Sequence, residues 1–185
     1  MARIPLFEEA AEPGLAAVVE RITSGRGALL NVYRLLLHSP ALAQTWFDHN
    51  SAVRFQTALT DRLREIVIIR IAHLNAIPYV LSQHVPALAV AAGVTVDECA
   101  ALADWRKFAR DRGGLFDARE RAALAYADAM TLSPHVPDDV FAAVREHFDD
   151  RGIVELSVLI GTYIMHNRVM NALGIDLEAE ENRGR

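Results

Sequence analysis

The fold of this chain is decided by one stretch, Leu63-Arg64-Glu65-Ile66-Val67-Ile68-Ile69-Arg70-Ile71-Ala72. Apolar side chains occupy most of the circumference when this stretch is wound as a helix. A helix of that kind is normally buried on most of its sides. We therefore predict a helix over residues 61–74 that lies inside the core and is interrupted only by Glu65, Arg70 and His73.

Helical periodicity continues on both sides of this stretch, and no strand alternation is found. Thr95 and Glu98 match a capping box, Pro86 predicts a local distortion, and Gly174 suits a helix end. The sequence predicts an all-α chain that forms a single domain over residues 1–185, with a loose charged tail over 178–185. The helical segments are expected at residues 13–23, 29–38, 40–58, 61–74, 78–93, 95–101, 117–130, 137–148 and 151–173.

Bulk properties exclude several classes of function. The 185 residues carry a net charge of −5, which gives no electrostatic support for nucleic-acid binding. No apolar run is long enough for a membrane span, and the N-terminus does not resemble a signal peptide. The single cysteine, Cys99, permits no intrachain disulfide. We expect a cytoplasmic protein that binds neither nucleic acid nor membrane.

Glu65 is the first candidate for chemistry. A carboxyl group among apolar side chains is costly to ionise unless it is paired, so its protonated form becomes easier to populate near neutral pH. That property suits a general acid or base. A structural ion pair with Arg62 or Arg70 explains the same residue, and spacing alone favours this second interpretation.

His84 is the second candidate, on a largely apolar helical face. Its intrinsic pKa near neutrality suits proton transfer, although a lone histidine on such a face is more often a core residue. Tyr79 and Gln83 lie one turn apart on a neighbouring face, where they supply hydrogen bonds either to a ligand or to the core. The final helix places His166 and Asn167 on the possible polar wall of a small pocket.

The spacing of the seven histidines matches no H-x-x-x-H or H-E-x-x-H pair. We therefore expect no metal and no cofactor. Phosphate-binding loops and nucleophile elbows are also absent from the sequence.

Several segments together resemble the carboxymuconolactone decarboxylase family, which includes the alkylhydroperoxidase D-like proteins. The resemblance covers about residues 40–177 and leaves the N-terminal helices at 13–38 outside it. It is carried by residues 63–70, Tyr79, 83–86, 91–94, 120–124, 127–129, 155–163, 167–168 and 171–174. It implies an alkylhydroperoxidase D-like helical domain that forms a homo-oligomer, commonly a trimer or hexamer.

The redox members of that family resemble the pattern E, eleven residues, then C-x-x-C-x-x-x-H. Glu65 and His84 stand at the acid and histidine positions, whereas Ile77 and Val80 stand at the two cysteine positions. A dithiol mechanism needs an attacking thiolate and a resolving thiol, so peroxidase activity is not expected. Decarboxylase-like relatives often carry Glu at the position of Val80.

The resemblance implies that Glu65 and His84 face one cavity. Our first hypothesis is an acid/base lyase or isomerase acting on a small carboxylated or lactone-like metabolite. In it His84 moves the proton at the reacting carbon, Glu65 orients the imidazole or relays the proton, and Tyr79 polarises a substrate oxygen. Substrate contacts are predicted for Asn75, Gln83, His166 and Asn167. The second hypothesis is a non-catalytic oligomeric scaffold or small-ligand binder, and the third is a redox protein that uses Cys99.

Overall fold

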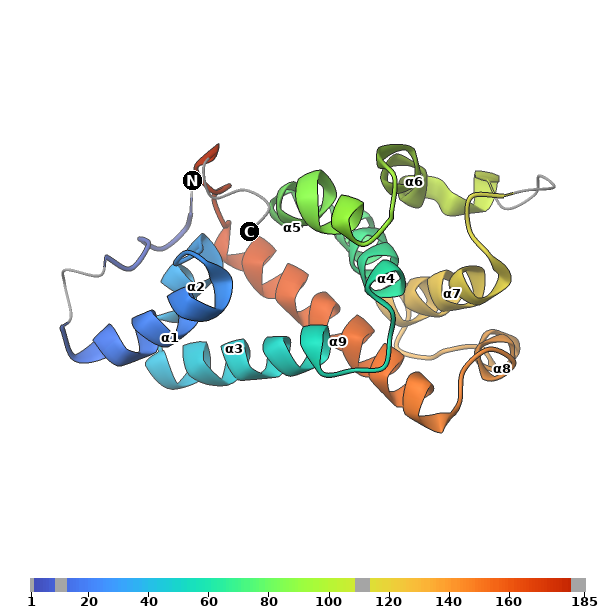
Figure 1. The fold of residues 1–185 in the computed structure, drawn as a ribbon, viewed down its shortest axis with the longest axis horizontal. Coiled ribbons are helices and arrows are strands. Elements are labelled where there is room, and N and C mark those ends of the chain that lie inside the picture. Colours follow the sequence, from blue (N-terminus) through green and yellow to red (C-terminus); the bar gives the residue numbers. More distant parts are fainter. Residues whose placement is uncertain (1, 9–12, 109–113, 181–185) are drawn as a thin grey trace.

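The computed structural model describes residues 2–8, 13–108 and 114–180, and these residues contain helices and no strand (Figure 1). The all-α prediction is confirmed. The elements in chain order are η2 (Pro13–Leu15), α1 (Ala16–Arg26), α2 (Asn31–Leu36), α3 (Pro40–Phe55), α4 (Asp61–Leu74), α5 (Pro78–Gln83), η3 (His84–Ala89), α6 (Val96–Ala101), η4 (Leu102–Phe108), α7 (Ala118–Leu132), α8 (Asp138–Arg145) and α9 (Asp150–Leu173).

Helix α4 is the central element, as its composition predicts. Residues 65–72 are all buried, including the charged Glu65 and Arg70. Val67 and Ile68 belong to the larger hydrophobic cluster with α3 and α9, whereas Ile66 and Ile69 belong to a second cluster with α6, η4 and α7. Because α4 supplies side chains to both clusters, it must be apolar on nearly every face.

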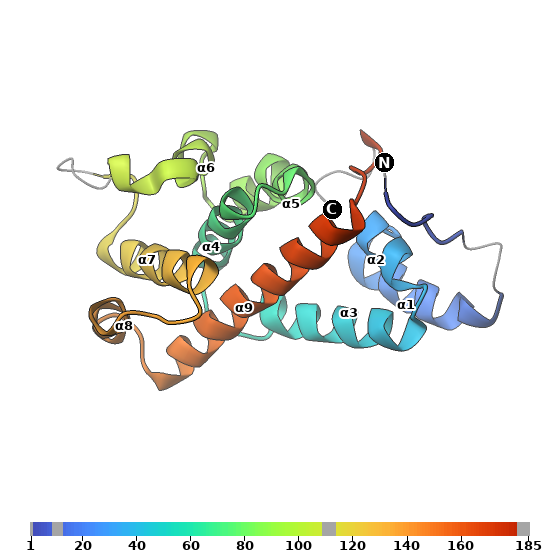
Figure 2. The same ribbon diagram turned by 180° about the vertical axis from the view of Figure 1, so that it is seen from behind.

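Helix α9 is the longest element and crosses the molecule diagonally, with α3 along one side and α4 and α5 along the other (Figures 1 and 2). Asp149 caps its first turn by accepting a hydrogen bond from the backbone N–H of Gly152 at 2.8 Å. Gly174 ends it in the left-handed conformation, with φ of 63°. Glycine adopts this backbone conformation without a steric penalty, so the predicted helix end is explained.

The predicted distortion at Pro86 is found as a π-helical segment, η3, which directly follows α5. Proline has no backbone N–H and its ring disfavours a regular α-helical turn, and π-type widening is one way to relieve this conflict. The widened segment begins at His84. Proline therefore affects the backbone that carries the candidate catalytic imidazole.

Two capping boxes share one cation. Glu98 completes the box at Thr95, as predicted, and Glu120 completes a second box at Asp117. The guanidinium of Arg62 donates to Glu98 at 2.6 Å and to Glu120 at 2.7 Å. Arg62 thus ties the start of α4 to the first turns of both α6 and α7.

The loose tail expected from residue 178 is not found at its first residue. Glu178 is only 3% exposed and accepts hydrogen bonds from the backbone N–H of Asn31 at 2.6 Å and the hydroxyl of Tyr79 at 2.5 Å. The apolar surroundings and these two donors hold a carboxyl group that the sequence alone assigns to solvent. Residues 181–185 of the predicted tail lie outside the described residues.

In the part of the chain that the structure describes, no helix is both long enough and apolar enough to cross a membrane.

Replacing Arg62 by Gln tests the tie between the three helices. The free energy of unfolding should fall by about 2 kcal/mol, because two mostly buried carboxylates lose their shared cation. Arg151→Gln is the matched control, since Arg151 is exposed and its ion pair among the described residues is with Glu155, one turn along α9; exposed pairs of this kind contribute little. Chemical denaturation measures the free energy of unfolding of both variants, and equal stability of the two would contradict the prediction.

Candidate active site

Glu65 and His84 form a buried hydrogen bond between α4 and the start of η3. The Nδ1 of His84 lies 2.6 Å from Oε2 of Glu65, and each residue is only 6% exposed. The contact between the two side chains is therefore present, although only His84 of the pair lines the cavity described below.

The alternative interpretation of Glu65 as the partner of a neighbouring arginine is wrong. Arg62 pairs with Glu98 and Glu120, and Arg70 donates to Asp128 at 2.5 Å. Both arginines point to other elements, so the carboxylate of Glu65 is left for His84.

The expectation that Glu65 becomes easier to protonate is also wrong. Burial by itself raises the pKa of Glu65, but the His84 imidazole, followed by Arg54 and Arg64, outweighs burial and lowers that pKa below its ordinary value. Glu65 is thus ionised at neutral pH and accepts the Nδ1–H of His84. In the neutral imidazole, this hydrogen bond favours the tautomer whose Nε2 carries the lone pair, which is the form that a general base requires.

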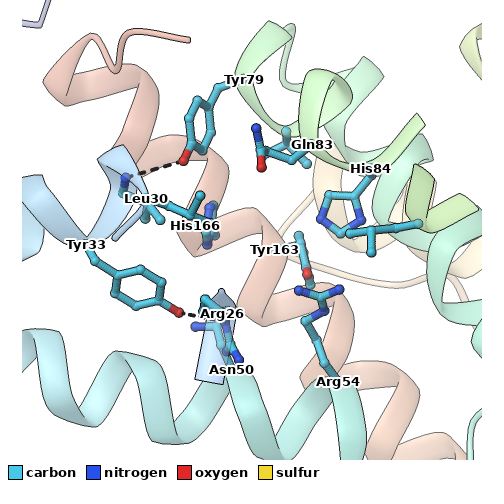
Figure 3. A pocket seen from close by; sticks show the side chains of 13 residues that line it. Arg26, Leu30, Tyr33, Asn50, Arg54, Tyr79, Gln83, His84, Tyr163 and His166 are labelled. Carbon is cyan, nitrogen blue, oxygen red and sulfur yellow. Dashed lines mark hydrogen bonds between the residues drawn. The ribbon is translucent and has the colours of Figure 1, made fainter. Parts of the chain in front are cut away.

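His84 lies in the wall of a small cavity of about 50 Å³ between α1, α2, α3, α5 and α9 (Figure 3). His84 is one of the residues that line this cavity, and its Nε2 has no hydrogen-bond partner among the described residues. The lining residues are Arg26, Leu30, Val32, Tyr33, Asn50, Arg54, Tyr79, Val80, Gln83, His84, Leu88, Tyr163 and His166.

Tyr79 lines this cavity, but its hydroxyl group is already engaged. It donates to Glu178 and accepts a hydrogen bond from the backbone N–H of Val32 at 3.4 Å (Figure 3). Burial, together with the carboxylate of Glu178, raises the pKa of Tyr79 far above its ordinary value. Tyr79 was predicted to polarise a substrate oxygen, but its hydroxyl group has no free hydrogen-bond donor for this role.

Gln83 and His166 bring unpaired polar atoms to the cavity. Gln83 is 6% exposed, and neither its amide nitrogen nor its amide oxygen has a partner among the described residues. The Nδ1 of His166 is likewise buried without a partner. Each such group costs about 1–3 kcal/mol of folding free energy when left unsatisfied, which is typical of a site that a ligand completes.

Tyr163 and His166 form the α9 side of the cavity. Their rings stack with centroids 5.7 Å apart, and the Tyr163 ring meets the edge of His84 at 5.8 Å. Burial raises the pKa of Tyr163 to about 12, so its hydroxyl stays protonated. Burial, with His84 and Arg54, lowers the pKa of His166 to about 3, so its imidazole stays neutral.

Two of the predicted substrate contacts lie elsewhere. Asn75 is the C-cap of α4, where its side chain donates to the backbone carbonyl of Ile71 at 2.9 Å and its own carbonyl accepts from Asn171. Asn167 is fully buried and is not part of the cavity lining. The structure therefore joins Gln83 and His166, but not these two asparagines, to the Glu65–His84 pair.

Sequence reasoning missed the residues that the N-terminal half brings to the cavity, namely Arg26, Tyr33, Asn50 and Arg54. Three of the four lie on α1 or α3. Asn50 and Arg54 are one helical turn apart, and this polar pair in an otherwise amphipathic helix was the available signal. Arg26 and Tyr33 lie outside the segment of resemblance, so no motif pointed to them.

The positions of the missing cysteines are apolar and packed. Ile77 is 1% and Val80 is 2% exposed, and Val80 forms part of the cavity wall. Cys99 is buried in the second hydrophobic cluster, and burial raises the pKa of its thiol, which disfavours the reactive thiolate. No group of three or more His, Cys, Asp or Glu side chains within the described ranges is placed to hold a metal ion.

The described residues have an all-helical fold that matches alkylhydroperoxidase D-like folds. Residues 40–129 match the model of the carboxymuconolactone decarboxylase family, which confirms the family resemblance seen in the sequence. The uncharacterized protein YdfG of Bacillus subtilis (strain 168) is 28% identical over 121 residues, which cover 64% of this chain and 78% of YdfG. The uncharacterized protein YnjA of Escherichia coli (strain K12) is 31% identical over 123 residues, 66% of this chain and 64% of YnjA.

Solved structures share the fold over most of the chain. An uncharacterized peroxidase-related protein from Silicibacter sp. TM1040 superposes with a TM-score of 0.81 at 20% identity, covering 98% of this chain and 94% of its own. A protein described as an alkylhydroperoxidase AhpD core, from Ralstonia eutropha JMP134, superposes with a TM-score of 0.79 at 22% identity, covering 98% of this chain and 94% of its own. The debrominase Bmp8 superposes with a TM-score of 0.72 at 20% identity, covering 94% of this chain and 91% of its own. At these identities the likeness concerns the fold alone.

Replacing His166 by Gln should make the protein less sensitive to mild acid. The unfolded chain binds a proton at this histidine as pH falls below about 6.5, whereas the folded imidazole stays neutral down to about pH 3. The unfolded state therefore holds more protons in this window, and stability falls with falling pH by about 1.4 kcal/mol per pH unit for one site. Unfolding measured between pH 5 and 6 should show a shallower slope in the variant; an unchanged slope would refute the buried neutral state.

Proposed function

We propose that the protein is an acid/base lyase or isomerase acting on a small carboxylated or lactone-like metabolite without a redox dithiol. The observation that carries this proposal is the buried hydrogen bond between Nδ1 of His84 and Glu65, which leaves Nε2 of this cavity-lining imidazole without a partner among the described residues. An imidazole held in one tautomer by a carboxylate behind it is prepared to take a proton from a bound molecule and to return it.

The proposed step is a proton transfer at a carbon next to a carboxylate or carbonyl group. The C–H electron pair moves into the substrate as the proton passes to Nε2 of His84, and the developing charge settles on a substrate oxygen. Glu65 stabilises the imidazolium that forms. Return of the proton to another carbon completes an isomerisation. A decarboxylation starts instead from the protonated imidazole: loss of CO₂ leaves a carbanion that takes the Nε2 proton, and the imidazole regains a proton from solvent.

The donor to the substrate oxygen is assigned to Tyr163 in place of Tyr79. Tyr79 is engaged with Glu178, whereas the Tyr163 hydroxyl has no partner among the described residues and belongs to the ring next to His84. A protonated phenol beside the base is able to donate a hydrogen bond to an oxygen that gains charge. This assignment keeps the chemistry of the original hypothesis and changes the residue.

The second candidate function is a small-ligand binder without chemistry. It is favoured by the packed Ile77 and Val80 at the positions where redox relatives carry cysteines, and by the absence of a carboxyl group at position 80. A binder needs the cavity but not the proton-transferring pair. The two functions therefore differ in what loss of His84 does.

Turnover of β-keto acids, 2-hydroxy and 2-oxo acids and small lactones distinguishes an acid/base enzyme from a small-ligand binder. With a substrate found for the wild type, His84→Gln and Glu65→Gln should each lower kcat by about 100-fold or more, the contribution expected of a general base. His135→Gln, on the exposed turn before α8, is the matched control and should retain full turnover. Full activity in His84→Gln would refute the enzymatic proposal, and binding without turnover by the wild type would favour the binder.

We also propose that the protein is a homo-oligomer, a trimer or hexamer. An outward stripe on α9 supports this proposal. Val154, Val158 and Met165 are 61%, 43% and 41% exposed, and Gly161 lies between them at helical spacing. A Cβ at Gly161 meets no atom of the chain within 4 Å, so another helix has room to approach closely. Exposed apolar stripes of this kind are typical of subunit interfaces.

Light scattering should give three or six times the 20.4 kDa mass of the chain. Val158→Asp should shift the population toward monomer, because a carboxylate in an apolar interface is left without a partner. Val96→Asp places the same charge on an exposed valine at the start of α6 and serves as control. A monomeric wild type, or an unchanged assembly in Val158→Asp, would refute the interface on α9.

A further inference from the structure

The cavity beside His84 is positively charged although the chain as a whole is acidic. Its lining includes the guanidinium groups of Arg26 and Arg54 and no carboxylate, whereas the chain carries a net charge of −5. The carboxylate of Glu65 stands behind the imidazole and is matched to it. A cavity lined by cations and no anion selects negatively charged ligands.

The two arginines differ in how they are held. Arg26 donates to the Tyr33 hydroxyl at 3.2 Å and to Ser51 Oγ at 3.0 Å, so it is fixed by the protein. Arg54 makes neither a hydrogen bond nor an ion pair within the described residues. Its guanidinium carbon lies 5.0 Å from the centroid of the Phe55 ring. Figure 3 shows Arg54 rising from α3 toward Tyr163. Arg54 is therefore the cation with donors free for a ligand.

Gln83 supplies the second, independent sign of a ligand. It approaches the cavity from α5, beside His84 and across from α3 (Figure 3). Its amide is buried with both polar atoms unpartnered, and a buried amide offers two N–H donors and one acceptor. The unpartnered Nδ1 of His166, which is neutral, adds one donor or acceptor. These groups match the hydroxyl or carbonyl of a small molecule.

We propose that the cavity binds a small monocarboxylate that carries a hydroxyl or carbonyl group next to the carboxylate, with the carboxylate on Arg54 and the second group on Gln83. This inference rests on the proposed function, whose substrate class it narrows. The planar fork of a guanidinium matches the two oxygens of a carboxylate. The amide then orients the adjacent carbon toward Nε2 of His84.

Size and charge restrict the ligand further. A water molecule needs about 10–15 Å³ of such space, so the cavity of about 50 Å³ has room for roughly three to five water-sized groups. Two- and three-carbon 2-hydroxy and 2-oxo acids are of this size, whereas a substituted lactone requires the lining to move. Arg54 is the guanidinium whose donors are free, and its planar fork matches the two oxygens of one carboxylate.

Calorimetric titration with glycolate, acetate and inorganic phosphate tests the proposal on the full-length protein. The wild type should bind glycolate more tightly than acetate or phosphate. Arg54→Gln should weaken glycolate binding by at least about tenfold, as expected for loss of a charge-assisted pair. Arg54→Lys, which keeps the charge but not the planar fork, should bind glycolate with an affinity between those of the wild type and Arg54→Gln. Arg145→Gln, on the exposed side of α8, removes the same charge elsewhere and should bind like the wild type.

Gln83→Met separates the second contact. It should reduce glycolate binding to the level of acetate and leave acetate binding unchanged, because acetate has no group for the amide. Wild type that binds none of the probes, tighter binding of phosphate than of glycolate, or unaltered binding in a folded Arg54→Gln would overturn the proposal.

His84→Gln distinguishes this inference from the proposed function. Glycolate binding that survives in His84→Gln supports the carboxylate site whether or not the protein turns over any substrate. Loss of turnover with intact binding supports both. If binding fails in the wild type while His84-dependent turnover is found, the acid/base function stands and the carboxylate site falls.

Discussion

Burial of residues 65–72 of α4 between two hydrophobic clusters is the constraint on which the rest of this structure depends. Polar side chains on such a helix have little access to solvent, so they need partners from other elements. Arg62 has Glu98 and Glu120, Glu65 has His84, Arg70 has Asp128, and the ring of His73 has the backbone carbonyl of Cys99. These pairings set the positions of α5, α6 and α7 around α4.

The Glu65–His84 pair differs from the others in what lies beyond it. Arg70 is enclosed by Asp128 and by the backbone carbonyls of Leu102 and Ala103, so its donors are used within the protein. The imidazole of His84 uses one ring nitrogen for Glu65 and presents the other to a cavity. The same requirement that stabilises the core therefore also prepares a base, and this explains how one interaction serves both packing and chemistry.

The two ends of the chain complete the cavity that α4 and α5 begin. Arg26 and Tyr33 come from the N-terminal helices, which lie outside the matched family segment, and Glu178 near the C-terminus engages Tyr79 behind the cavity wall. Groups from outside residues 40–129 thus form part of the cavity wall, beside Arg54, Gln83 and His84 from within that segment.

The sequence by itself determined the all-helical fold, the buried α4, the capping box at Thr95, the distortion at Pro86 and the helix end at Gly174, because each depends on local periodicity or on the backbone preference of one residue. It also pointed to Glu65 and His84 through the family resemblance, in which they stand at the acid and histidine positions. Only the tertiary structure decided that Arg62 and Arg70 turn away from Glu65, that His84 lowers the pKa of Glu65, and that Glu178 is buried. It also brought Arg54 to the site and left Asn75 and Asn167 outside it. Such outcomes depend on contacts between segments far apart in the chain, and no local pattern records which of several possible partners a charged side chain will meet.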